Sequence, residues 1–183
     1  MMRSQQGGSS PSSGGSFPRL QFGAHTLANF GKGGENQDAF VASASTSGSK
    51  TLVGVFDGHG EQGGRVSGFA RTMIARCLFS HKELYTNPAA ALAAAFSETQ
   101  RLIERSHNFD AFHSGSTAVA VYHHRDRLWV ANVGDSRAVL GCCVDSSEKG
   151  EAAGPWVAIE LSSDQRPARE DERRRILAEG GAV

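Results

Sequence analysis

Residues 51–56 (TLVGVF) form a short apolar run that stops at an aspartate, Asp57. The length of the run and its β-branched side chains predict a buried strand. From residue 66 to residue 78, apolar residues then recur with the spacing of one helical face, which predicts an amphipathic helix packed on that strand. This order of elements places an acidic side chain at the mouth of a buried strand, held rigidly and half out of water.

The rest of the chain predicts an α+β fold with antiparallel sheets. An asparagine–proline pair, Asn87 and Pro88, suits the start of a second helix over residues 89–105. Short apolar runs predict further strands at residues 21–26, 38–42, 116–122, 128–133, 138–144 and 156–161, and a last helix follows at residues 169–179. Strands joined in sequence by short turns, with the helices in blocks, favour this class over alternating βαβ units.

The composition indicates one globular domain behind a polar tail. Residues 1–18 are rich in Gly and Ser and are expected to be disordered, whereas residues 19–183 are expected to fold as one domain. Basic and acidic residues balance at 19 each, which gives no electrostatic footprint for nucleic acid, and no apolar run is long enough to span a membrane. Cys77, Cys142 and Cys143 lack metal-ligand spacing and suit reduced thiols. We expect a monomer in the cytoplasm or nucleus.

The segment from Asp57 to Gly60 (DGHG) carries the chemistry of a metal site. Hard divalent cations such as Mg²⁺ prefer oxygen ligands, and the two carboxylate oxygens of Asp57 can bridge two of them. Gly58 has no side chain, so its carbonyl can approach a metal closely. His59 is then placed to donate a proton beside a metal-bound water. An ordinary Asp–Gly turn with an exposed histidine fits the same residues.

Residues 58–63 (GHGEQG) also match the G-x-G-x-x-G pattern of dinucleotide-binding folds, between a predicted strand and a predicted helix. Two features count against that interpretation. The helix is followed by a second helix instead of the parallel strand that such a fold needs, and the carboxylate of Asp57 would face the phosphates.

Two more acidic residues lie at predicted turns. Asp38 begins a predicted strand after a glycine-rich turn, where it is a candidate metal ligand or an ordinary capping residue. Asp135 lies between two predicted strands in the sequence GDSR, which also fits a simple β-turn. The residues alone leave both alternatives open.

Five short motifs occur in a fixed order along the chain: NQDA at residues 36–39, VFDGHG at 55–60, SGSTA at 114–118, VANVGDSRA at 130–138 and LSSDQRP at 161–167. Together they resemble the type 2C (PPM) family of metal-dependent serine/threonine protein phosphatases, in the N-terminal part of its catalytic domain. The resemblance covers nearly everything from residue 22 to residue 183. It implies an α-β-β-α sandwich, in which two antiparallel sheets are flanked by helices.

The resemblance implies hydrolysis of phosphoserine and phosphothreonine in proteins by a water activated at a centre of two Mg²⁺ or Mn²⁺ ions. In that pattern Asp57 bridges the ions, the carbonyl of Gly58 binds one of them, and Asp38 supports their bound waters. His59 protonates the leaving oxygen, and Asp135 corresponds to a ligand of a weaker third ion. The implied partner is a phosphoprotein substrate, with no nucleic acid and no membrane.

The chain departs from the family pattern near its N-terminal motif. Gln37 stands where the family often has Glu, and it is expected to hold a metal-bound water without adding charge. The arginine that often precedes this motif is replaced by Gly33, so Lys32 is the candidate that binds the substrate phosphate, as a point charge. Farther along, Gln165 replaces the usual histidine.

The family carries two further metal-binding aspartates in its C-terminal third, and they have no counterpart before Val183. We therefore expect the N-terminal portion of a catalytic domain, incomplete on its C-terminal side. The alternative is a phosphatase-like regulatory module that binds metal or a phosphoprotein partner without catalysis.

Overall fold

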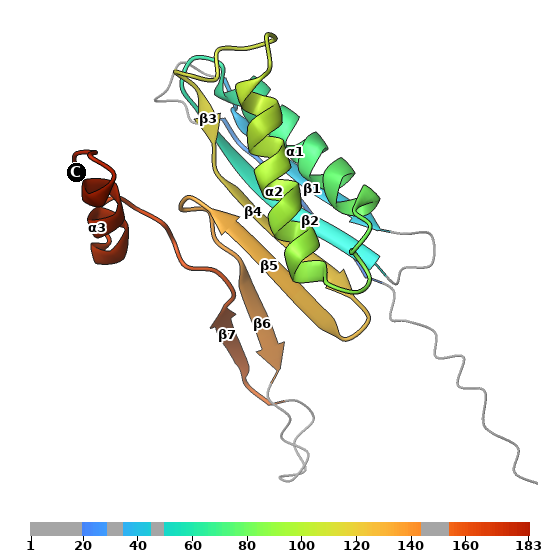
Figure 1. The fold of residues 1–183 in the computed structure, drawn as a ribbon. Helices are drawn as coiled ribbons and strands as arrows, with labels where there is room; N and C mark the ends of the chain where they lie inside the picture. Colours follow the sequence, from blue (N-terminus) through green and yellow to red (C-terminus); the bar gives the residue numbers. More distant parts are fainter. Residues whose placement is uncertain (1–19, 29–34, 45–49, 144–153) are drawn as a thin grey trace, which may run out of the picture.

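The computed structural model describes residues 20–28, 35–44, 50–143 and 154–183 (Figure 1). The predicted disordered tail, residues 1–18, lies outside them. Along the chain the elements are β1 (Asp38–Ala44), β2 (Lys50–His59), α1 (Gly63–Ser80), α2 (Pro88–Glu104), β3 (Gly115–Ser116), β4 (Ala118–His124), β5 (Arg127–Val133), β6 (Val139–Cys143), β7 (Trp156–Glu160) and α3 (Glu170–Ala178).

A five-stranded antiparallel sheet forms the centre of the molecule. Its strands lie in the order β1-β2-β4-β5, and the short β3 pairs with the last residues of β2. β1 borders β2 on one side and β4 borders it on the other. The apolar, β-branched sequence of β2 fits a strand that has neighbours on both sides.

Two helices, α1 and α2, cover one face of this sheet (Figure 1). Alternation along β2 places Leu52 on this face, where it is fully buried against Tyr122 of β4 and Leu92 of α2. The side chain of Asn87 accepts a hydrogen bond from the Ala90 N–H and so fixes the start of α2, as its sequence predicts. The apolar core of the described residues therefore lies between the helices and the sheet.

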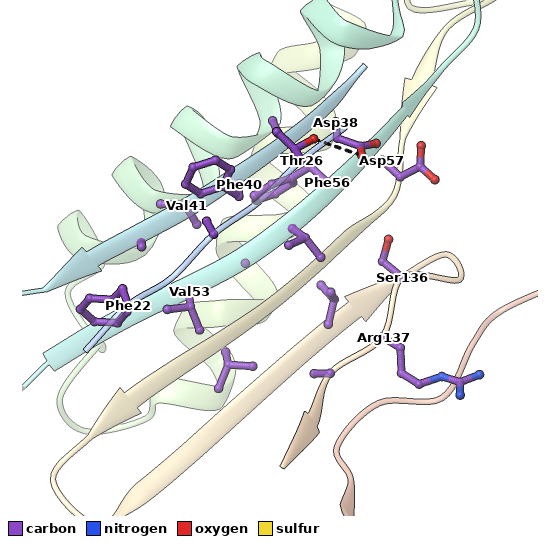
Figure 2. A pocket seen from close by; sticks show the side chains of 18 of the residues that line it. Phe22, Thr26, Asp38, Phe40, Val41, Val53, Phe56, Asp57, Ser136 and Arg137 are labelled. Atoms are coloured by element: carbon purple, nitrogen blue, oxygen red, sulfur yellow. Dashed lines mark hydrogen bonds between the residues drawn. The ribbon is translucent and has the colours of Figure 1, made fainter. Parts of the chain in front are cut away.

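The opposite face of the sheet is apolar but open. Phe40 and Val55 remain 40% and 47% exposed there. With Val53 they help to line a hollow of about 740 Å³, and Asp38 and Asp57 lie at one end of it (Figure 2). The acidic residues predicted from the sequence thus meet at the edge of an apolar surface.

The C-terminal part adds α3 and a second antiparallel sheet made of β6 and β7. All residues of both strands are exposed, and α3 has no buried residue. Acidic residues in the first turn of α3 and Arg175 in its last turn suit the helix dipole. None of the helices in the described part of the chain is long and apolar enough to cross a lipid bilayer.

The predicted fold class is confirmed, since the structure is α+β and both of its sheets are antiparallel. The strand predicted at residues 21–26 is wrong, because residues 20–28 adopt no regular secondary structure. Alternation of apolar and polar residues is not sufficient for a strand when the segment has no paired neighbour.

The boundaries around the acidic motif also differ from the prediction. β2 continues past residue 56 to His59, because β3 supplies partners for Gly58 and His59. The strand predicted at residues 116–122 is interrupted at Thr117, which belongs to neither β3 nor β4. The backbone N–H of Thr117 instead donates to the Asp57 carbonyl at 2.9 Å.

Candidate metal centre

Asp38 and Asp57 lie directly opposite each other on β1 and β2. Side chains at directly opposed positions of an antiparallel pair share one face of the sheet, with Cβ atoms about 5 Å apart. Both aspartates are exposed, and Figure 2 shows their carboxylates together at the end of the two strands. Strand pairing therefore brings together the two acidic residues that the motifs placed 19 positions apart.

The segment before β1 holds Asp38 in place. The backbone N–H of Asp38 donates to the side-chain oxygen of Asn36 at 3.0 Å, and the amide of Asn36 donates to the Thr26 hydroxyl at 2.7 Å. The Thr26 hydroxyl in turn reaches the Asp38 carboxylate at 3.5 Å, a weak contact (Figure 2). Residues 20–28 therefore position Asp38 although they form no strand.

Gly58 follows Asp57 in a space that admits only glycine. A Cβ at this position would lie 2.4 Å from the Gly63 carbonyl oxygen and 2.5 Å from that of Gln37. Both obstacles are backbone atoms, which cannot turn aside as a flexible side chain can. The N–H of Gly58 donates to the same Gln37 carbonyl at 3.2 Å. The absence of a side chain at residue 58 therefore lets the backbone segments of Gln37 and Gly63 pack closely against Gly58, and the role of its carbonyl as a metal ligand stays a prediction.

Gln37 is turned toward the loop between β2 and α1. Its side-chain amide donates to the Gly60 carbonyl at 2.9 Å, and its Oε1 lies 2.4 Å from where a Cβ of Gly63 would stand. Its backbone carbonyl accepts a hydrogen bond from the Ser67 hydroxyl of α1 at 2.6 Å. The amide donor thus braces the loop that follows His59, a bond that the carboxylate of Glu could not make. The predicted role of Gln37 in holding a metal-bound water stays a prediction.

His59 is exposed at the end of β2, where Gly115 of β3 is its backbone partner. A Cβ on Gly115 would lie 2.6 Å from the His59 Nε2 atom, so the imidazole ring lies directly over this glycine. The ring is restrained on one side and open to solvent on the other. This position suits exchange of a proton with a bound molecule, and the role of His59 as proton donor stays a prediction.

Asp135 lies on the turn after β5, apart from the Asp38–Asp57 pair in its contacts. Its carboxylate pairs with the Arg166 guanidinium at 3.3 Å and is 45% exposed. The preceding Gly134 has a φ of +93°, which favours glycine. Within the described ranges, no three His, Cys, Asp or Glu side chains lie close enough together to hold a metal ion. The structure therefore brings Asp38 and Asp57 together and gives Asp135 a cationic partner.

Gln165 fixes the turn that carries Asp135. Its side-chain oxygen accepts a hydrogen bond from the Gly134 N–H at 3.1 Å, and its side-chain nitrogen donates to the Asn132 carbonyl at 3.2 Å. Its backbone N–H donates to the Gly134 carbonyl at 2.9 Å. The sequence indicated that Gln165 replaces a histidine, and the structure shows what the amide contacts.

Asp164 connects the same segment to Arg137 through two hydrogen bonds of 2.8 Å. The Arg137 guanidinium holds the pKa of the Asp164 carboxyl below its ordinary value, with Arg166 and Arg169 acting in the same direction. Burial opposes this effect. Asp164 is therefore an ionised anchor and not a free ligand.

Thr117 is the site residue that sequence reasoning did not single out. Its hydroxyl oxygen accepts a hydrogen bond from the Asp57 N–H at 3.0 Å and lies 2.6 Å from the Ser136 hydroxyl oxygen. The sequence shows that Thr117 belongs to the motif SGSTA, but it does not show which residues Thr117 contacts. Lys32, the predicted phosphate-binding residue, lies outside the described residues.

The donor set fits a hard divalent cation in kind. The exposed carboxylates of Asp38 and Asp57 and the backbone carbonyl of Gly58 offer oxygen atoms, the ligands that Mg²⁺ and Mn²⁺ prefer. Mg²⁺ keeps several of its waters in proteins and is commonly bound through one or two carboxylates. Asp38 and Asp57 meet that minimum, and any further ligands would be waters, phosphate oxygens or other groups.

Comparison with known proteins points in one direction. A family model described as protein phosphatase 2C matches residues 18–183. A probable protein phosphatase 2C 59 of Oryza sativa subsp. japonica is 36% identical over 180 residues, which cover 95% of this chain and 50% of the relative. A probable protein phosphatase 2C 69 of Arabidopsis thaliana is 39% identical over 135 residues, which cover 72% of this chain and 33% of the relative. The chain thus spans about half, or less, of the length of these curated relatives.

Solved structures agree on the fold. The crystal structure of serine-threonine phosphatase 2C from Toxoplasma gondii matches with a TM-score of 0.63 at 19% identity, covering 81% of this chain and 52% of that one. The PPM Ser-Thr phosphatase MsPP from Mycobacterium smegmatis matches with a TM-score of 0.50 at 19% identity, covering 81% of this chain and 56% of that one. At such identities the likeness concerns the fold.

Proposed function

The chain belongs to the protein phosphatase 2C family, and from this premise we propose that it is a metal-dependent hydrolase of phosphoserine and phosphothreonine in proteins. Family membership confirms the resemblance that the motifs indicated. The observation that carries the proposal is the cross-strand pair of exposed carboxylates, Asp38 and Asp57, beside the constrained Gly58. A pair of this kind in a hydrolase family suits a centre of two divalent cations.

In this proposal Asp57, the Gly58 carbonyl and Asp38 would hold two divalent cations. Asp57 would serve both of them, the Gly58 carbonyl one of them, and Asp38 their bound waters. When bound, Mg²⁺ or Mn²⁺ lowers the pKa of a coordinated water and neutralises charge on the phosphate. The protein would hold the carboxylates in position in the absence of the cations. Pairing of β1 with β2 does this for both aspartates, and the bonds from Asn36 and Thr117 hold their backbones.

His59 would supply the proton that the leaving seryl or threonyl oxygen needs. Hydrolysis adds one water across the phosphorus–oxygen bond, so the departing oxygen gains a proton as inorganic phosphate forms. His59 follows Asp57 by two residues, and its exposed imidazole lies against Gly115, which restrains the ring. General acid catalysis by such a group typically contributes about 10²–10⁴-fold to the rate.

Two further residues complete the proposal. Lys32 would attract the substrate phosphate as a point charge. Asp135 would bind a weaker third ion, and for this the Arg166 guanidinium, 3.3 Å away, has to move aside. The substrate would be a phosphoprotein, and the protein would act as a monomer in the cytoplasm or nucleus.

A non-catalytic, phosphatase-like binding module is the second candidate. The observation that favours it is the number of acidic ligands, because no cluster of three candidate metal-binding side chains occurs within the described residues. Two carboxylates can bind a cation weakly without assembling a complete centre. Such a module would bind Mn²⁺ and a phosphoprotein but would not turn the phosphoprotein over.

Hydrolysis of a phosphothreonine peptide in the presence of Mn²⁺ tests the proposal, with Asp57→Asn as the variant. The substitution keeps the shape of the side chain but removes the charge that holds the cations. Catalysis is expected to fall at least about a hundredfold, because the cations supply several kcal/mol of transition-state stabilisation. Asp126→Asn, the same change at an exposed turn between β4 and β5, is the matched control and should keep full activity.

Direct Mn²⁺ binding, measured on the same proteins, separates the two candidates. Binding with hydrolysis, both lost in Asp57→Asn, supports the enzyme. Binding that Asp57→Asn abolishes, without hydrolysis by the parent chain, supports the binding module. A parent chain that neither binds Mn²⁺ nor hydrolyses the peptide contradicts both.

A further inference from the structure

The side chain of Thr117 lies between the two segments that carry Asp57 and Asp135. Its hydroxyl oxygen accepts the Asp57 N–H at 3.0 Å and lies 2.6 Å from the hydroxyl oxygen of Ser136, the residue after Asp135. Its own N–H donates to the Asp57 carbonyl at 2.9 Å. One residue therefore holds the backbone of Asp57 on both sides and reaches the turn of the second acidic residue.

The methyl group of Thr117 packs against the turn that carries Asp135. It lies 2.8 Å from where a Cβ would stand on Gly134, the residue before Asp135. Gly134 has its positive φ at this point, so the turn bends around the methyl group. The two branches of a single threonine side chain thus contact the residues on both sides of Asp135, Gly134 and Ser136.

The hydrogen-bonding capacity of one hydroxyl matches these contacts. A threonine hydroxyl has one proton to donate and two lone pairs to accept with. One lone pair receives the Asp57 N–H, and the proton or the second lone pair serves the Ser136 hydroxyl, whichever of the two donates. Valine would keep the shape and lose both bonds, whereas serine would keep the bonds and lose the methyl contact.

The local backbone places Thr117 opposite Asp57. It lies between β3 and β4 and belongs to neither strand. β3 pairs with Gly58 and β4 pairs with β2 up to Val55, so Thr117 faces the stretch of β2 that contains Asp57. The interruption of the strand therefore falls where the acidic residue needs support.

We propose that Thr117 is a positioning residue, which fixes the end of β2 carrying Asp57 relative to the turn carrying Asp135. This inference rests on the proposed function, in which both carboxylates bind cations. Residues that orient metal ligands through hydrogen bonds typically contribute about 10- to 100-fold to metal affinity. Thr117 would orient Asp57 through hydrogen bonds to its backbone, and Asp135 through contacts with Gly134 and Ser136.

The test compares Thr117→Val and Thr117→Ser with the parent chain, and uses Thr99→Val as the matched control. Thr99 is a buried threonine, whereas Thr117 is half-buried, and the Thr99 hydroxyl donates within its own helix to the Ala95 carbonyl at 2.8 Å. Mn²⁺ affinity is measured by electron paramagnetic resonance of the free ion. Amide hydrogen exchange is measured by NMR on the metal-free proteins.

Thr117→Val is expected to weaken Mn²⁺ binding about 10- to 100-fold, and Thr117→Ser to restore most of it. In the metal-free protein, Thr117→Val should speed exchange of the Asp57 amide and of the amides in the turn at residues 134–137 about fivefold or more, since a hydrogen bond of ordinary strength is lost. Thr99→Val should change neither measurement at these positions.

Several results would overturn the inference. Unchanged exchange at both segments in Thr117→Val would do so, as would Mn²⁺ affinity equal to that of the parent chain, or a loss in Thr117→Ser as large as in Thr117→Val. A parent chain without Mn²⁺ binding would refute the proposed metal centre, and the exchange measurement would then decide whether Thr117 links the two segments.

If Thr117→Val does not fold, Ser136→Ala removes the hydrogen bond between the two segments from the other side. Faster exchange of the Asp57 amide in that variant would support the inference, and unchanged exchange would refute it.

Discussion

The helix-covered sheet and the C-terminal segment, residues 154–183, are held in the molecule by different kinds of interaction. In the sheet, Leu52, Tyr122 and Leu92 are fully buried between strands and helices. In the C-terminal segment, every residue of β7 is exposed and α3 has no buried residue. Burial of apolar area stabilises the first region, and it contributes little to the second.

Directed polar contacts attach the C-terminal segment instead. Asp164 binds Arg137 through two hydrogen bonds, and Gln165 binds the turn after β5. The Leu161 N–H donates to the Ala138 carbonyl at 2.9 Å, and the Ala138 N–H donates to the Ser162 hydroxyl at 2.9 Å. These bonds specify a position while adding modest net stability, since each replaces a bond to water.

Because the two regions are held by different interactions, the proposed site has two parts that differ in how firmly they are supported. Asp38 and Asp57 lie on paired strands whose other face is packed against the helices. Asp135 lies on a turn held by the polar contacts of the C-terminal segment. The first pair should therefore keep its geometry under conditions that displace Asp135, and the following experiments compare the two regions on that basis.

The largest contrast is expected between leucine-to-alanine substitutions in the helix-covered sheet and in the two-stranded sheet to which β7 of the C-terminal segment belongs. Leu52→Ala opens a cavity in the core and should lower the free energy of unfolding by about 3 kcal/mol. Leu140→Ala makes the same change on β6, where the side chain is 36% exposed, and should cost about 1 kcal/mol or less. Urea unfolding curves measure both. Equal losses would show that the C-terminal sheet is packed as tightly as the core.

Removal of the Gln165 amide is expected to have an intermediate effect confined to one region. Gln165→Leu deletes the bonds to the Gly134 N–H and the Asn132 carbonyl, so the turn at Asp135 should open more easily by roughly 1–2 kcal/mol. Hydrogen exchange of the Gly134 amide reports this opening, and amides of β2 should keep their protection. Gln100→Leu, on the exposed surface of α2, serves as the control. Loss of protection throughout β2 would contradict the division into two regions.

Acidification should give the smallest effect, at the contact between Asp164 and Arg137 that attaches the C-terminal segment. Because Arg137 holds the folded-state pKa of Asp164 below 3.8, this contact stabilises the segment above that pH. The contribution is lost as the pH falls through the lowered folded-state pKa. Amide chemical shifts of Ala138 and Leu161, followed by NMR from pH 6 to pH 2, should therefore move only below pH 3.8.

Asp164→Asn provides the control for this titration. It should loosen the segment at neutral pH and remove the step below pH 3.8, because an amide does not titrate there. A step of the same size in the variant would assign the acid sensitivity to another group.

The fold class and the position of Asp57 at the end of a buried strand were predictable because their signals are local. An apolar run that ends in Asp57 and a helix of regular spacing after it can be identified within about 30 residues. The direct pairing of Asp38 with Asp57 could not be predicted, since it depends on the register of β1 against β2. Family resemblance supplied the expectation that they meet, and strand pairing supplies the reason.

The remaining parts of the site depend on contacts between distant residues. Thr117 reaches Asp57 across 60 positions, and only because the strand is interrupted at that residue. Gln165 and Arg166 reach the turn of Asp135 from 31 positions along the chain. Hydrogen bonds of this kind leave no periodic pattern, so a sequence shows the donors and acceptors but not how they combine.

The pairing of Asp38 with Asp57 also limits which insertions and deletions this lineage of proteins can tolerate. If a mutation removed one residue from the middle of β1, the aspartate would move to the position opposite Phe56. Alternate positions of a strand point to opposite faces, so its carboxylate would turn toward the apolar contacts of α1. A change in the chain before Asp38 has no such consequence. Changes of length should therefore accumulate outside β1 over evolutionary time, while the seven residues of the strand stay constant in number.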